Sequence, residues 1–117
     1  MTVQHANEIP AVVVKAGDHT RLQVLLESEQ FIIRRFLMAP GGGMPAHTNT
    51  VEHGQYVLTG KARIEVDGQV YDVQAGDVVF IPAGVLHWYQ NTGETDFEFL
   101  CIIPNKPDEI TLAAKDC

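Results

Sequence analysis

Cysteine, positive charge and long apolar runs are all scarce in this sequence. Its two cysteines are Cys101 and Cys117, and a bond between them would close only the C-terminal tail. We therefore expect two free thiols in a reducing compartment. No apolar run approaches the roughly 20 residues that a membrane-spanning helix needs. The N-terminus lacks the basic start and the apolar stretch of a signal peptide. These features predict a cytoplasmic protein that does not bind membranes.

The scarcity of basic residues also bears on the partners of the protein. Eight lysines and arginines stand against fifteen aspartates and glutamates, so the formal net charge is −7. Nucleic acids and anionic membranes are bound through basic patches, so we expect neither as a partner, and a small molecule remains the expected ligand. A chain of 117 residues can bury its own core. No repeat or linker divides it, which predicts a single domain over residues 1–117.

Short runs of β-branched and aromatic residues, separated by turn residues, fill most of the chain. Such residues fit a pleated, half-buried surface, and strands at this spacing predict an all-β sandwich or barrel. One hairpin is clearly marked, because a two-residue Asp67-Gly68 loop favours the type I′ turn. The expected strands are 11–15, 22–27, 31–39, 54–59, 62–66, 69–73, 77–81, 86–90 and 97–103.

Two segments give weaker signals for a strand. Residues 27–35 have some helical spacing, but their apolar residues are denser than an amphipathic helix needs, so we expect a long buried strand there. The tail, residues 104–117, contains two prolines. We expect it to form one short helical turn or to remain irregular.

Three of the five histidines are candidates for metal binding. His47 stands two residues from Asn49, so on a strand both side chains point to the same face. His53 begins the next apolar run, and His87 precedes a run of aromatic residues. Neutral imidazole is the most common protein ligand for borderline divalent metals. The three rings converge only if the sheet closes around them. Any one of them alone is more often a hydrogen-bonded histidine of the core or the surface.

The segments around these histidines resemble the two sequence motifs of the cupin family. Residues 42–60 read GGMPAHTNTVEHGQYVLTG, which is similar to the first motif: a glycine, His-x-His, a third ligand and a closing glycine. Residues 76–91 read GDVVFIPAGVLHWYQN, which is similar to the second motif at every specified position. The resemblance covers about residues 31–103. It implies a double-stranded β-helix, the jelly-roll barrel of cupins, with strands of residues 9–30 before it and the tail after it.

The resemblance implies one divalent transition metal bound by His47, Asn49, His53 and His87. His53 stands where the broad family has a glutamate, which is similar to the small four-histidine cupins that bind manganese or iron. Asn49 stands where those proteins have their second histidine, and only its amide oxygen is able to ligate a cation. Three interpretations stay open: three imidazoles with one amide oxygen, three imidazoles with an open face, or a site that has lost its metal. Manganese, iron, nickel and zinc all suit these ligands.

Strand alternation and the resemblance together predict the lining of the cup. Alternation from His53 and His87 turns Gln55 and Tyr89 inward. The resemblance adds Arg34, Phe99, Cys101 and Ile103. Met44 is expected at the mouth of the cup. The predicted lining is Arg34, Met44, Gln55, Tyr89, Phe99, Cys101 and Ile103.

Two of these lining residues allow alternative roles. An inward Arg34 needs an anionic partner, which is either a substrate carboxylate or an internal glutamate. Cys101 is either a small core residue, the more common use, or a group with metal-linked redox chemistry.

The resemblance leaves several functions open, because this barrel hosts many unrelated activities. The leading hypothesis is a metal-dependent oxidoreductase, of the dioxygenase type, that acts on a small organic substrate at open metal positions. The alternatives are a non-catalytic module that binds a small ligand or a metal, and a metal-independent isomerase of the sugar-epimerase kind. No catalytic residue is marked in the sequence. Small cupins commonly pair, which implies a homodimer through residues 9–30, where 11–15 is an apolar edge. Alternatively, this strand completes its own sheet.

Overall fold

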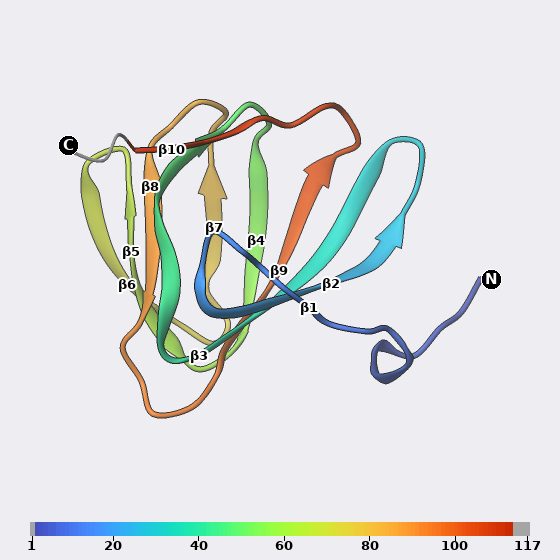
Figure 1. Ribbon diagram of the computed structural model, residues 1–117, viewed down its shortest axis with the longest axis horizontal. Coiled ribbons are helices and arrows are strands. Elements are labelled where there is room, and N and C mark those ends of the chain that lie inside the picture. Colours follow the sequence, from blue (N-terminus) through green and yellow to red (C-terminus); the bar gives the residue numbers. More distant parts are fainter. Residues whose placement is uncertain (1, 114–117) are drawn as a thin grey trace.

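Strands make up almost all of the regular structure. The computed structural model describes residues 2–113, so Cys117 lies outside the described residues (Figure 1). In this part of the chain no helix has the length and hydropathy of a membrane span. The elements are η1 (Ala6–Glu8), β1 (Val12–Val13), β2 (Asp18–Glu27), β3 (Phe31–Asn49), β4 (His53–Thr59), β5 (Lys61–Val66), β6 (Gln69–Gln74), β7 (Val78–Ile81), β8 (His87–Asn91), β9 (Phe97–Pro104) and β10 (Ile110–Leu112).

The all-β class predicted from the sequence is confirmed, and each of the nine expected strands is present. The Asp67-Gly68 hairpin is also present: it joins β5 to β6, and both residues have positive φ, as a type I′ turn requires. Residues 27–35 fall at the end of β2 and the start of β3, and contain no helix.

The strand expected over 31–39 continues through two prolines and three glycines to Asn49. Glycine permits this continuation because the chain turns at Gly41, where φ is +80°, and then passes very close to β8. A side chain at Gly43 would place its Cβ 2.1 Å from the carbonyl oxygen of Tyr89. The long β3 therefore contributes to both halves of the barrel. Its first half pairs with β2 and β9, and its second half pairs with β8 and β10.

The expectation of a helical turn or an irregular tail is wrong for residues 110–112. These residues form β10, which pairs antiparallel with the last three residues of β3. The pairing is favourable because it gives hydrogen-bond partners to backbone groups at an otherwise open strand edge. The register sets Leu112 opposite His47 and Ile110 opposite Asn49, so the tail lies directly beside two candidate ligands.

The strands curl around a common interior in the order β6-β5-β8-β3-β9-β4-β7 (Figure 1). Burial alternates along the strands, as it must when one face is inside. On β9 the buried residues are Phe97, Phe99, Cys101 and Ile103. On β4 and β8 the inward series begin at His53 and His87 and continue to other buried side chains. The apolar core is thus continuous with a polar cup that contains the histidines.

Candidate metal centre

The strand register brings His47, His53 and His87 into one cup. His47 lies opposite His87 in the pairing of β3 with β8, and their ring centroids are 4.2 Å apart. The ring of His53, from the first residue of β4, is 6.0 Å from that of His87. The three residues are 4%, 4% and 1% exposed. The three rings therefore border the same cavity.

Each of the three imidazoles is bonded through Nδ1 to a backbone carbonyl two residues earlier in the chain. A carbonyl only accepts, so Nδ1 carries the hydrogen and donates it. In a neutral imidazole this leaves Nε2 with a free lone pair, which is the arrangement that orients metal-binding histidines. The bonds are His47 Nδ1 to Pro45 O (2.7 Å), His53 Nδ1 to Val51 O (3.0 Å) and His87 Nδ1 to Val85 O (2.9 Å).

A turn before β8 sets the position of His87. Gly84 has a φ of +79°, a conformation that glycine adopts at low cost. Its backbone N–H donates to the carbonyl of Asn49 at 2.8 Å. This bond fastens the turn that carries His87 to the end of β3, where His47 and Asn49 lie. Gly84 of the second motif thus helps to fix the candidate ligands relative to one another.

The side chain of Asn49 has its two ends in different surroundings. Its Nδ2 donates to Oδ2 of Asp108 at 3.1 Å, and Thr50 holds the same carboxylate through a backbone N–H at 3.0 Å. Its Oδ1 is buried and has no hydrogen-bond partner among the described residues. Asp108 therefore occupies the amide nitrogen and leaves the oxygen free. No sequence pattern marks Asp108, because it is 59 residues from Asn49 and only the packing of the tail brings the two together.

A cavity of about 100 Å³ lies among these groups. Five of the predicted lining residues border it: Arg34, Met44, Gln55, Tyr89 and Phe99. Cys101 and Ile103 are buried but do not border it. Cys101 lies behind the lining, where its Sγ accepts from Arg34 Nη2 at 3.5 Å and from Gln55 Nε2 at 3.6 Å. Apolar residues that the sequence did not single out complete the wall: Val14, Leu22, Phe36, Met38 and Ile110.

The donor set fits a metal ion by its chemistry. Among residues 2–113, no three histidine, cysteine, aspartate or glutamate side chains stand close enough for a ready-made cage. An ion would therefore bind only with some adjustment of the rings. However, Nε2 of His87 and Oδ1 of Asn49 are both buried without a partner in the described structure. Such groups are rare in folded proteins, and an ion would supply the partner that both lack.

Burial favours the neutral forms of four ionisable groups in and beside the cup. It lowers the pKa of His53 to about 4, with a further contribution from the charge of Arg34. It lowers the pKa of His87 to about 4 as well. Burial also raises the pKa of the Tyr89 phenol and of the Cys101 thiol. A protonated, buried thiol is a poor nucleophile, which favours the core role of Cys101 over the redox role.

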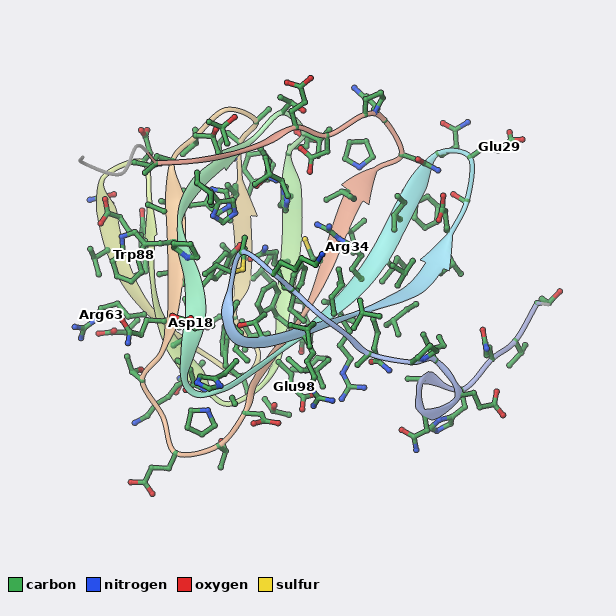
Figure 2. All side chains as sticks on the ribbon, in the orientation of Figure 1. Asp18, Glu29, Arg34, Arg63, Trp88 and Glu98 are labelled. Carbon is green, nitrogen blue, oxygen red and sulfur yellow. The ribbon has the colours of Figure 1, made fainter. Side chains whose placement is uncertain are left out.

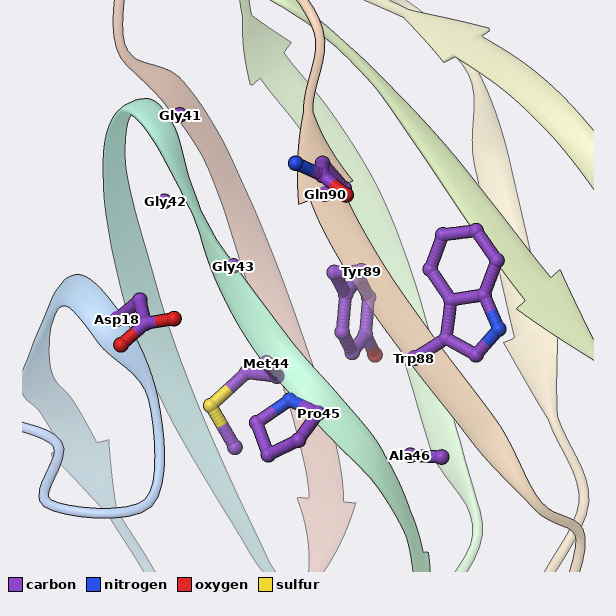
Figure 3. Close-up of a pocket in the computed structure, with 10 residues that line it drawn as sticks. All are labelled: Asp18, Gly41, Gly42, Gly43, Met44, Pro45, Ala46, Trp88, Tyr89 and Gln90. Carbon is purple, nitrogen blue, oxygen red and sulfur yellow. The ribbon is translucent and has the colours of Figure 1, made fainter.

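A second hollow lies on the outer side of β3 and β8 (Figure 3). It has a volume of about 240 Å³, and no histidine borders it. Trp88 lies there, and its indole N–H donates to Glu65 at 2.9 Å. This hollow shares Met44 and Tyr89 with the cup but none of its histidines. Its lining is Asp18, Gly41, Gly42, Gly43, Met44, Pro45, Ala46, Trp88, Tyr89 and Gln90.

Acid should destabilise the metal-free protein through His53 and His87. Both have a folded-state pKa of about 4 against an ordinary value of 6.5, so the unfolded chain binds protons first as the pH falls. The free energy of unfolding is therefore unaffected by these two histidines above pH 6.5, and it decreases as the pH falls from about 6.5 to 4. The loss is at most about 1.4 kcal/mol per pH unit for each histidine. Urea unfolding of wild type and His53→Gln across this range measures it.

The His53→Gln variant should show a shallower pH dependence, whereas His19→Asn, at an exposed position, should keep the wild-type slope. Equal slopes in wild type and His53→Gln would contradict the assignment of this pH dependence to the cup.

Comparison with known proteins agrees with this geometry. Residues 34–103 match the Cupin_2 family of cupin domains. The oxalate-binding protein of Thermotoga maritima is 30% identical over 86 residues, which cover 73% of this chain and 71% of that protein.

Two solved structures illustrate the similarity of the fold. The polyketide cyclase RemF from Streptomyces resistomycificus has a TM-score of 0.89 and 24% identity, with 99% of this chain and 87% of that chain covered. A predicted oxalate decarboxylase from Thermotoga maritima has a TM-score of 0.77 and 25% identity, with 96% and 100% covered. The fold is the double-stranded β-helix that the motifs implied, and the chain belongs to the cupin family.

Proposed function

We propose that this cupin binds one divalent transition metal and acts as an oxidoreductase, of the dioxygenase type, on a small organic substrate. The ligands are Nε2 of His47, His53 and His87, with the amide oxygen of Asn49 as the fourth. The observation that supports this most directly is the common orientation of the rings, each of which uses Nδ1 for its own backbone and keeps Nε2 free. Manganese, iron, nickel and zinc suit such ligands.

When bound, the ion would supply Lewis-acid and redox chemistry at its open coordination positions. The protein supplies a dry and rigid wall. Phe36, Phe99 and Tyr89 stack in sequence, with centroids 5.1 and 5.3 Å apart. Gln55 donates to the hydroxyl of Tyr89 at 2.7 Å, so this hydroxyl keeps its own hydrogen for a ligand. These contacts exclude water and orient a substrate beside the ligands.

A non-catalytic binding module is the second candidate. It is favoured by the absence of a general acid or base among the lining residues that the structure describes. The imidazoles are assigned to the ion, and the phenol of Tyr89 stays protonated because burial raises its pKa. The relative from Thermotoga maritima is named for oxalate binding, which agrees with this candidate. A metal-independent isomerase has less support, because it gives no role to three converging Nε2 atoms.

Metal loading and oxygen uptake test the proposal together. An ion at about 100 times its Kd stabilises the folded state by about 2.7 kcal/mol, which raises the Tm of a domain this size by on the order of 10 °C. We expect this rise with manganese or iron(II) in wild type and its loss in His87→Ala. The matched control is His5→Ala, at an exposed position, which should keep the rise.

The same metal-loaded samples should consume oxygen with a member of a panel of phenols, thiols and 2-oxo acids. Uptake by wild type but not by His87→Ala supports the oxidoreductase. Metal binding without uptake for any metal favours the binding module. If no divalent metal raises the Tm, the metal centre itself is refuted.

Asp108 should control the affinity for metal through Asn49. An aspartate at 108 only accepts, so it selects the amide nitrogen of Asn49. In Asp108→Asn this selection is lost, because the new amide both donates and accepts, and Asn49 is free to turn its nitrogen toward the ion. Residues that orient a ligand typically contribute about 10- to 100-fold in metal affinity. We expect a loss of about tenfold in calorimetric titrations with manganese.

Asp72→Asn removes an equal charge at an exposed ion pair with Arg63, and should leave the affinity unchanged. The double variant Asn49→Asp/Asp108→Asn presents an oxygen in either orientation and should recover metal binding. Wild-type affinity in Asp108→Asn would refute the orienting role.

We also infer that two copies of the chain pair through residues 9–30. Within the described residues β1 has only β2 as a strand neighbour, and Val12 and Val13 are 57% and 74% exposed. Exposed apolar strand edges favour pairing with another strand. Light scattering should give twice the chain mass of 12.9 kDa for wild type, and the single mass for Val13→Lys. Val3→Lys, at another exposed valine, is the control. A monomeric wild type would rule out this pairing.

A further inference from the structure

Arg34 and Arg35 are neighbours on β3, but only one of them is neutralised by the protein. Arg35 forms an ion pair with Glu98 and donates from Nη1 to Gln23 at 3.3 Å. Arg34 has no ion pair within residues 2–113, and its Nε is buried without a partner there. Its Nη2 has only the sulfur of Cys101, at 3.5 Å. The glutamate that an inward arginine might have used is therefore bound to the other arginine.

The surroundings of Arg34 do not compensate its charge. A thiol is a weak acceptor, and the ring of Phe36, 5.1 Å from the guanidinium carbon, contributes a modest cation–π attraction. No aspartate or glutamate is among the residues that line the cavity. A partly buried cation without an anion is costly, and no acidic side chain within residues 2–113 takes the role of its partner. An anionic ligand fills this role.

Arg34 belongs to the same cavity as the candidate metal ligands. The sulfur of Cys101 accepts from both Arg34 and Gln55, and Gln55 stands two residues from His53 on the inner face of β4. In Figure 2 Arg34 lies in the middle of the barrel, whereas Glu29 and Arg63 lie at its edges. The guanidinium and the neutral hydroxyl of Tyr89 are thus donors beside the metal donor set.

We infer that Arg34 forms an anion subsite and that the ligand of this cup is a small carboxylate with a second oxygen donor, such as a dicarboxylate or a 2-oxo acid. The planar fork of an arginine matches a carboxylate. The second oxygen donor of the ligand would bind the ion, so this part of the inference rests on the proposed metal centre. The cavity is small, with a volume of about 100 Å³. The part of the ligand that lies inside this cavity therefore has few non-hydrogen atoms, as a small carboxylate does.

Calorimetric titration of the manganese-loaded protein with oxalate, and with its neutral diamide oxamide, tests the subsite. The two probes have the same number of non-hydrogen atoms but differ in charge. Wild type should bind oxalate and should bind oxamide at least tenfold more weakly. Arg34→Gln should weaken oxalate binding by about 10- to 100-fold, as expected for a hydrogen bond to a charged group. Arg35→Gln, which removes the neighbouring charge, should bind oxalate within about twofold of wild type.

The possible outcomes separate this inference from the proposed metal centre. If manganese loads but Arg34→Gln binds oxalate as wild type does, the subsite is refuted and the metal centre stands. If manganese does not load but oxalate still raises the Tm of wild type and not that of Arg34→Gln, the subsite stands and the metal centre fails. If Arg34→Gln does not fold, the metal-free wild type still decides, because without the ion equal affinities for oxalate and oxamide refute the subsite.

Discussion

Each inward histidine is bonded through Nδ1 to the carbonyl two residues before it, and the character of the cup depends on these three bonds. They fix the tautomer and the direction of each ring with groups that lie close in the chain. The barrel then needs only to bring three short segments together, which it does through the pairing of β3 with β8 and the start of β4. The cup is therefore a set of locally prepared donors that the tertiary fold assembles.

The charge balance of the cup is the second constraint. Burial favours neutral forms of His53, His87, Tyr89 and Cys101, so Arg34 remains as the charged group of the described lining. Asp108 stands at the end of the Asn49 side chain and orients it. A cup of neutral donors beside one cation suits a small anion better than a neutral or cationic molecule. This balance supports the same ligand class for the oxidoreductase and for the binding module.

Much of the fold followed from local sequence patterns. Alternating β-branched and aromatic runs marked nine strands, because a strand with one buried face has a period of two. The Asp67-Gly68 loop marked its hairpin, because few residue pairs adopt positive φ at both positions. The resemblance of the segments around His47, His53 and His87 to the two cupin motifs marked the cup. The strands and the hairpin depend on interactions between residues close in the chain.

Other features were decided only by tertiary structure. The sequence left open whether Arg34 pairs with an internal glutamate. The register of β3 with β9 places Glu98 beside Arg35, and these two residues form the ion pair. It left open which end of Asn49 faces the cup, and a tail residue decides this by hydrogen bonding. It placed Cys101 in the lining, but the side chains of Arg34 and Gln55 lie between that sulfur and the cavity. These outcomes depend on contacts between residues far apart in the chain, and strand register, which no local pattern specifies, sets such contacts.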